Sequence, residues 1–461
     1  MKTGINGLIT LGLICAATGL AAAPIDEQRV AQIAQVELKE LGAPSSSVAI
    51  ILDDRIVYAE AFGKAQLNPA RAAIRSDRYQ VGSISKEFLA TALLMLQEDG
   101  KLSLDDQVGK YLPELETAKN VTLRQLLSHT SGIRDYWPQD YVFSQMLTPV
   151  SHAQILQQWA RQPLDFAPGE RWQYSNTGYV VAGVIFEKVA GEPLFTFLQR
   201  RVFSPLHMTS VENIDEGIAS SSDAVGYNRA ALGPSRPAPH VGKGWLFAAG
   251  ELAMTAEDLA RWDLSIIDQT LLKPASYREL ESEVRLQDGV GTRYGLGLFV
   301  EQSSERRMLW HDGETSGFIS YHSIYPDQRA AIIVLTNSDG SDAALSTAYK
   351  LRSVVLEQVS PVDQARLNEA RQMFEQLRAG RLDRTLLSPN ANVYFTPQTV
   401  QDIAGSIAPL GPIQSFELKQ SGTRGGMDYR TYEIKLAKRQ LGLVTRSLPN
   451  GKLEQYMISA K

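Results

Sequence analysis

Val81-Gly82-Ser83-Ile84-Ser85-Lys86 is the stretch on which the prediction of the fold depends. Apolar residues recur at helical spacing over residues 89–96 and Asp99-Gly100 ends the pattern, so a helix is expected to begin near Ser83. A serine and a lysine three residues apart then share a face of its first turn. The positive end of the helix favours an anion at the Ser83 hydroxyl, and Lys86 reaches back to the same point. This arrangement can activate a serine nucleophile.

The same spacing also arises by chance, when a helix-capping serine is followed by a surface lysine. The residues before the stretch favour the catalytic interpretation. A short strand is expected around Tyr79, so strand, turn, serine and helix follow one another in that order. The rest of the chain has to supply the partners of such a nucleophile.

The length and composition indicate a globular protein with more than one domain. The chain has 461 residues, of which 44% are hydrophobic and 21% are charged, enough for two or three domains with a sizeable core. The formal charge is −5 and no basic patch with interleaved aromatic residues occurs, so no nucleic-acid partner is expected. The single cysteine, Cys15, argues against disulfides and thiolate metal sites. We expect neither a metal nor a cofactor.

The first 23 residues have the pattern of a secretory signal peptide. Lys2 precedes an apolar run over residues 8–20, and Ala21-Ala22-Ala23 supplies small residues for cleavage before Pro24. The run is too short to span a membrane, and no membrane span is expected in the mature chain. We therefore expect export to the periplasm or the medium.

Hydrophobic periodicity divides the remainder into two domains. Residues 24–359 are expected to form an α/β domain with an antiparallel sheet flanked by helices and a mostly helical insert. Residues 362–461 are expected to form a small α+β domain without a set of catalytic residues. In the first domain helices are predicted over residues 27–41, 123–127, 153–159, 180–190, 195–202, 258–267 and 343–356, and strands over 47–62 (a hairpin), 294–301, 307–311, 318–325 and 329–336. In the second, helices are predicted over 365–377 and 400–407, and strands over 416–418, 429–436, 441–445 and 453–458.

A second candidate motif is Tyr174-Ser175-Asn176, which lies between a turn and a predicted helix, where functional side chains are often placed. A phenol becomes a useful acid or base if a nearby positive charge lowers its pKa, and Lys86 could supply that charge. The alternative is a buried tyrosine followed by a helix-capping asparagine.

The third motif is His311-Asp312-Gly313-Glu314, where a predicted strand ends at His311 and meets a turn. Gly313 would let a substrate approach the backbone, and nearby N–H groups can face a developing oxyanion. The alternative is a simple turn with no role in a site.

In this order and at these separations, the three motifs resemble the serine beta-lactamase and penicillin-recognising hydrolase family. The branch concerned holds class C beta-lactamases, D-Ala-D-Ala carboxypeptidases, D-aminopeptidases and related esterases, and the resemblance covers residues 27–358. Further stretches carry it: Leu126-Leu127-Ser128-His129-Thr130-Ser131-Gly132-Ile133, Gly169-Glu170, and residues 250–259.

The resemblance implies a beta-lactamase-like fold and a serine hydrolase that works through an acyl-enzyme. It implies that Ser83 is the acylated nucleophile, that Lys86 and Tyr174 move its proton, and that Asn176 binds substrate. It leaves open whether Lys86 or Tyr174 takes the first proton. The implied oxyanion hole is formed by the backbone N–H groups of Ser83 and Glu314.

One position departs from the lactam-hydrolysing members, which carry lysine where this chain has His311. Histidine is only partly charged near neutral pH and offers no permanent cation to a substrate carboxylate. Glu314 adds a negative side chain nearby. Both residues favour a small ester or a D-amino-acid amide as substrate over a lactam, with a beta-lactamase, a penicillin-binding sensor or a non-hydrolytic scaffold as alternatives. No feature of the sequence specifies an oligomeric state.

Overall fold

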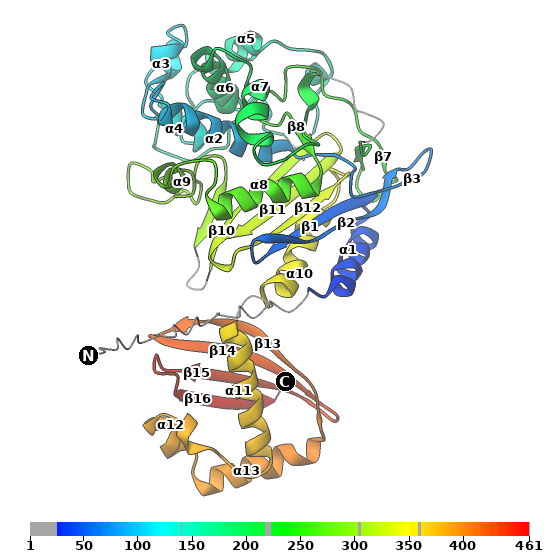
Figure 1. Ribbon diagram of the computed structural model, residues 1–461, viewed down its shortest axis with the longest axis vertical. Helices are drawn as coiled ribbons and strands as arrows, with labels where there is room; N and C mark the ends of the chain where they lie inside the picture. Colours follow the sequence, from blue (N-terminus) through cyan, green and yellow to red (C-terminus); the bar gives the residue numbers. More distant parts are fainter. Residues whose placement is uncertain (1–24, 140, 217–222, 303–305, 358–360, 461) are drawn as a thin grey trace, which may run out of the picture.

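A seven-stranded antiparallel sheet organises the larger part of the molecule in the computed structural model, which describes residues 25–139, 141–216, 223–302, 306–357 and 361–460 (Figure 1). The predicted signal peptide, with Cys15, lies outside the described residues. The strand order is β3-β2-β1-β12-β11-β10-β9. The strands are β1 (Ser45–Leu52), β2 (Arg55–Gln66), β3 (Arg71–Ala72), β9 (Phe299–Gln302), β10 (Arg307–Thr315), β11 (Phe318–Tyr325) and β12 (Ala330–Thr336).

Helices cover both faces of this sheet, which explains why β1 is buried along its whole length. Val48, Ile50 and Leu52 pack towards α1 (Glu27–Leu41) and α10 (Ala343–Glu357). The alternate residues Ala49 and Ile51 belong to the larger core on the opposite face, where α8 (Ala256–Asp268) lies. The period of two along the strand thus assigns successive side chains to two different cores.

The helical insert lies on the α8 side of the sheet (Figure 1). Its central helix is α2 (Ser85–Glu98), in which every residue from Ser85 to Leu96 is buried. A helix that is buried on all sides is enclosed by protein, and α2 is therefore a fixed support for the residues at its N-terminus. The other helices here are α3 (Val108–Tyr111), α4 (Leu123–Leu127), α5 (His152–Ile155), α6 (Asn176–Ala190), α7 (Leu194–Leu198) and α9 (Pro274–Leu280). Short strands β4 (Tyr79–Gln80), β8 (Leu252–Met254) and β5 (Glu212–Asn213) form a second sheet, and β6 (Tyr227–Asn228) pairs with β7 (Arg236–Pro237).

The C-terminal part has its own four-stranded sheet, with α11 lying across it (Figure 1). Phe374 of α11 packs with Tyr432 and Leu443 of the sheet in a core of its own. This separate core supports the predicted division into domains at residues 359–362, which stays a prediction. The elements are α11 (Pro361–Arg378), α12 (Pro389–Tyr394), α13 (Pro397–Ile407), β13 (Ile413–Arg424), β14 (Met427–Leu436), β15 (Gln440–Ser447) and β16 (Leu453–Ala460).

The predicted fold class is confirmed. Among the strand boundaries that were wrong, two bear on the site. The strand expected over residues 294–301 begins at Phe299, because Tyr294 turns inward to the site described below. The strand expected to end at His311 continues to Thr315, so His311 and Gly313 lie inside β10 and not in a turn. They stay in the ladder because β11 pairs with them, His311 with His322 and Gly313 with Ser320. None of the helices in the described ranges is long and apolar enough to cross a membrane.

Candidate active site

Ser83 lies in a single helical turn, Gly82–Ile84, between β4 and α2. The preceding Val81 N–H donates to the Leu252 carbonyl at 3.0 Å, which ties this turn to β8. Gly82 has a φ of +51°, and a methyl group there would lie 2.8 Å from the Glu314 backbone nitrogen. Glycine is therefore needed both for the backbone conformation and for the close approach of β10. The approach brings the backbone of Glu314 close to that of Ser83, as the predicted oxyanion hole requires.

Gly313 has a different role from the one expected from the sequence. A Cβ at this position would lie 1.9 Å from the Val81 carbonyl oxygen and 2.6 Å from the Ser320 hydroxyl. The space above Gly313 is thus filled by the segment that carries the nucleophile, and the expectation that a substrate approaches there was wrong. A glycine inside a strand marks close contact with another backbone. Gly313 therefore lets β10 pack directly against the Ser83 turn.

The Lys86 ammonium nitrogen, Nζ, is surrounded by three oxygen atoms. It lies 2.9 Å from Ser83 Oγ, 2.9 Å from Asn176 Oδ1 and 2.7 Å from the Ala249 carbonyl oxygen. The side chain has no solvent-exposed surface. Lys86 is therefore part of an internal network, and the alternative of a surface lysine was wrong.

These contacts fit a neutral amine that faces the nucleophile. The Asn176 and Ala249 oxygens can only accept hydrogen bonds, so each takes one N–H of Lys86. The third neighbour of Nζ is the Ser83 hydroxyl, which can donate its hydrogen to the lone pair on Nζ. Burial lowers the pKa of the Lys86 ammonium to about 7, although Asp135 and Asp312 oppose this shift. Near neutral pH a large fraction of Lys86 can accept the Ser83 proton.

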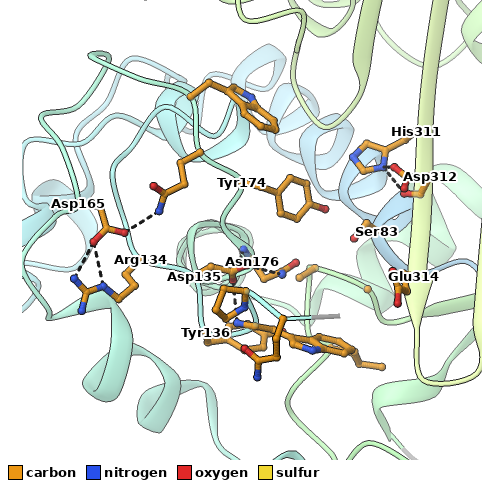
Figure 2. A pocket seen from close by; sticks show the side chains of 18 of the residues that line it. Ser83, Arg134, Asp135, Tyr136, Asp165, Tyr174, Asn176, His311, Asp312 and Glu314 are labelled. Carbon is orange, nitrogen blue, oxygen red and sulfur yellow. Dashed lines mark hydrogen bonds and ion pairs between the residues drawn. The ribbon is translucent and has the colours of Figure 1, made fainter. Parts of the chain in front are cut away.

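Tyr174 lines the same pocket as Ser83 (Figure 2). Burial raises the pKa of its phenol well above 10, and a hydrogen bond with Ser83 opposes this shift. Lys86 Nζ lies 4.9 Å from the centre of the Tyr174 ring but has no part in lowering this pKa. The expectation of a phenol made acidic by Lys86 was wrong. The arrangement instead suits a neutral phenol that donates its O–H to Ser83.

Asp135 fixes Asn176 at the start of α6, and sequence reasoning did not identify it. Its Oδ1 accepts from the Asn176 backbone N–H at 2.9 Å, and its Oδ2 accepts from Asn176 Nδ2 at 3.2 Å. With Nδ2 bound in this way, Asn176 Oδ1 has to face Lys86. Asp135 lies 41 positions before Asn176 in the chain, in a loop without a recognisable motif, which is why the spacing gave no sign of it.

His129 is a second functional candidate that the sequence indicated only as part of a family marker. Its ring lies 4.1 Å from the Tyr174 ring between centroids, and its Nδ1 accepts from the Ser175 N–H at 3.1 Å. The φ of His129 is +59°, an uncommon conformation for a residue with a side chain. Such conformations persist where the surroundings enforce them, often at functional sites. His129 therefore supports the ring of Tyr174 from behind.

His311 is buried, with 1% of its surface exposed. Its Nδ1 lies 2.5 Å from the Asp312 carbonyl oxygen, which can only accept, so Nδ1 carries the proton. Nε2 then accepts from the Tyr294 hydroxyl at 2.9 Å. Burial lowers the pKa of His311 to about 3, although Glu87 opposes this shift. The expectation that His311 is partly charged near neutral pH was wrong, because the site holds it neutral.

A buried ionic triad supports α2 and the sheet behind these residues. His322 donates to Asp263 at 2.8 Å and to Glu87 at 2.7 Å, and all three side chains are almost completely buried. Burial alone lowers the pKa of His322, but Glu87 and Asp263 outweigh it and raise the pKa to about 10. Because Glu87 follows Lys86, the triad fixes the first turn of α2 against β11 and α8.

The catalytic candidates open into a pocket of about 640 Å³ (Figure 2). Its charged lining consists of Asp135, Asp165, Asp312 and Glu314, with Arg134 as the only cation among the lining residues. Arg134 is already paired with Asp165 at 2.8 Å. The pocket is therefore acidic. Its aromatic walls are Tyr136, Trp137, Trp172, Tyr174 and Phe299.

The pKa of Lys86 leads to an expected pH profile. A base with this pKa that takes the proton of Ser83 predicts that kcat/KM for an uncharged ester rises with pH through a midpoint near 7 and then levels off. Initial rates measured at a series of pH values between 5 and 9 give this midpoint. The midpoint should persist in His311→Gln, since His311 does not titrate in this range. If the rising limb disappears in that variant, His311 and not Lys86 is the titrating base.

The chain is similar to proteins of one family. A family model described as Beta-lactamase matches residues 30–356. Protein flp of Staphylococcus aureus is 27% identical over 325 residues, which cover 68% of this chain and 63% of that protein, so the chain spans less than two thirds of its length. The structure of a D-stereospecific amidohydrolase from Streptomyces sp. is 26% identical, with a TM-score of 0.62 and coverage of 71% of this chain and 98% of that chain. The octameric penicillin-binding protein homologue from Pyrococcus abyssi shares the fold at 22% identity and a TM-score of 0.64, covering 94% of this chain and 100% of that chain.

Proposed function

Because the chain belongs to the beta-lactamase family and has the fold of its serine hydrolases, we propose that it hydrolyses a small ester or amide through an acyl-enzyme on Ser83. One observation carries this proposal. Lys86 Nζ lies 2.9 Å from Ser83 Oγ, and its two other oxygen partners take its N–H groups. A lone pair is thereby directed at the hydroxyl, which is what activation of a serine requires.

In the proposed reaction Ser83 Oγ bonds to the substrate carbonyl carbon as its proton passes to Lys86 Nζ. The oxyanion forms near the backbone N–H groups of Ser83 and Glu314. The bond to the leaving group then breaks, and the proton held by Lys86 reaches that group with Tyr174 as relay. A water molecule next gives a proton to the same pair and its oxygen attacks the acyl carbon. Ser83 leaves as the hydroxyl and the acid product is released.

The acidic lining of the pocket favours substrates that are neutral or carry an amine. Four carboxyl groups face it, and the only guanidinium among the lining residues, Arg134, already forms an ion pair with Asp165. His311, at the position where lactam-hydrolysing members carry lysine, is neutral. A substrate carboxylate would find no unpaired cation in the described pocket and would be repelled by Asp312 and Glu314. Esters and amino-acid amides lack this charge. The amide branch is further supported by the likeness to a D-stereospecific amidohydrolase.

Penicillin binding is the second candidate, supported by the likeness in fold to a penicillin-binding protein homologue. The two candidates differ in turnover. A panel of short-chain nitrophenyl esters, D- and L-amino-acid amides and a chromogenic cephalosporin separates them. Multiple turnovers of an ester or amide with little lactam hydrolysis support the first candidate. A stable acyl-enzyme with the lactam and no turnover of the others would contradict it.

His311→Lys tests the substrate class within that panel. A lysine ammonium restores a cation near a substrate carboxylate, while Asp312 and Glu314 partly neutralise it. The ratio of kcat/KM for the cephalosporin to that for the neutral ester should rise about fivefold, which corresponds to about 1 kcal/mol of added attraction. His311→Gln is the matched neutral control and should leave the ratio unchanged. If lysine and glutamine change the ratio equally, the charge at this position does not select the substrate.

Export is a separate proposal, supported by the apolar run over residues 8–20 and the small residues that follow it. Expression with and without residues 1–23 tests it. The form that includes residues 1–23 should be cleaved and then recovered from the periplasm or the medium. Recovery of both forms from the cytoplasm, uncut, would contradict export.

A further inference from the structure

The segment over residues 244–250 forms one wall of the active site without being helix or strand. It supplies the Ala249 carbonyl oxygen that lies 2.7 Å from Lys86 Nζ. Leu246, Ala249 and Gly250 also line the pocket. All residues of the segment are buried. A buried irregular segment needs partners for its backbone groups, because no ladder or helix supplies them.

The N–H groups of Ala249 and Gly250 bond to the Leu246 carbonyl within the segment. Two buried carboxyl groups bind N–H groups of the residues before them. Asp215, 7% exposed, accepts from the Gly244 N–H at 2.9 Å and from the Leu246 N–H at 3.1 Å, both through Oδ1. Glu251, 3% exposed, accepts from the backbone of Ala248 and from Asn213 Nδ2, the latter at 3.0 Å. The two carboxyl groups thus hold the segment at Gly244, Leu246 and Ala248, just before Ala249.

The conformation that they hold is not one the segment would adopt by itself. Ala248 has a φ of +59°, in the left-handed region that residues with a Cβ avoid. Such a residue persists where surrounding contacts over-determine it. The accepting Glu251 carboxyl binds Ala248 itself, next to the carbonyl that contacts Lys86. The unusual backbone conformation and the hydrogen bond that holds it are therefore both at Ala248, the residue directly before Ala249.

We propose that Asp215 and Glu251 are positioning residues for Lys86, acting through the Ala249 carbonyl. The inference rests on the proposed function, because it concerns the base that activates Ser83. The Ala249 oxygen takes one N–H of Lys86 and so helps to direct the lone pair to Ser83. Loss of either carboxyl group frees the segment and removes this acceptor.

The environment of both groups fits a functional role. Burial raises the pKa of Asp215 to about 6, although the hydrogen bonds from Leu246 and Gly244 oppose this shift. Burial, together with the nearby Asp215, raises the pKa of Glu251 to about 8, although its hydrogen bonds oppose this shift. Carboxyl groups held in such surroundings are costly to bury and gather at functional sites.

The test measures the pKa of Lys86 directly, by NMR titration of the protein carrying lysine labelled with carbon-13 at Cε. Lys86→Met identifies the signal. In Asp215→Ala and Glu251→Ala the ammonium loses a charge-assisted hydrogen bond, so the pKa of Lys86 should fall by roughly one unit. Asp215→Asn and Glu251→Gln keep an accepting oxygen and should restore the wild-type value. The asparagine and glutamine variants also separate the acceptor from the charge.

Glu37→Ala is the control for lost stability. Glu37 is 2% exposed and binds Lys350 and Ser346 on the opposite side of the sheet. Its removal should lower Tm without moving the pKa of Lys86. If the alanine variants at 215 and 251 behave in the same way, their role is structural only and the proposal is overturned. The titration needs no turnover, so an unchanged pKa of Lys86 contradicts only this positioning role. Failure of the proposed function would instead show as absence of acylation at Ser83.

Discussion

Replacing Ser83 with alanine is expected to reduce hydrolysis of the best ester or amide by at least about a thousandfold. The variant keeps the pocket and the Lys86–Asn176 contact, so substrate should still bind with little change in affinity. The oxygen that forms the acyl-enzyme is the atom that is lost. Initial rates and substrate binding measured on the same preparations separate these two effects.

A fluorophosphonate probe followed by mass spectrometry locates the reactive oxygen. The label should be found on Ser83 in the wild type and be absent from Ser83→Ala. Ser85 is the matched control, because it lies in the next turn, is buried, and accepts from the Leu252 N–H at 3.2 Å. Ser85→Ala should still be labelled at Ser83. A label on any other residue, or undiminished turnover in Ser83→Ala, would contradict the assignment.

Removing the amine of Lys86 should have an effect nearly as large. The methionine in Lys86→Met keeps an unbranched apolar side chain in the buried position but has no amine. Acylation of Ser83 should therefore fall by roughly a hundred- to ten-thousandfold. Tyr174→Phe removes the O–H that contacts Ser83 and should cause a loss in the same range. Single-turnover acylation rates measure both.

The double variant tests whether the two groups act together. Groups that form one proton relay are strongly non-additive, so Lys86→Met with Tyr174→Phe should lose far less than the product of the single losses. Wild-type-like thermal unfolding of the three variants is the control for folding. Losses that multiply would mean that one of the two side chains serves the structure and not the proton transfer.

Long periodic segments were predictable because their pattern is local. The helices Glu27–Leu41 and Leu123–Leu127 and the strand Phe318–Tyr325 have the bounds that the sequence predicted. In each case the spacing of apolar residues and the flanking turn residues suffice to define the element. The end of β10 was predicted wrongly because a glycine such as Gly313 usually indicates a turn. Here glycine is necessary inside the strand, because Val81, far away in the sequence, lies against it.

The sequence by itself determined the fold class and identified Ser83, Lys86, Tyr174 and Asn176 as candidates. Short motifs fix residue types at fixed spacing, and a helical turn places Ser83 and Lys86 on one face. Only the tertiary structure decided the chemical state of these groups. It lowered the pKa of Lys86 by burial, kept His311 neutral by burial and a hydrogen bond with Tyr294, and added Asp135 and the Ala249 carbonyl from distant loops. Burial and hydrogen bonding depend on which distant segments meet, and neither spacing nor composition records that.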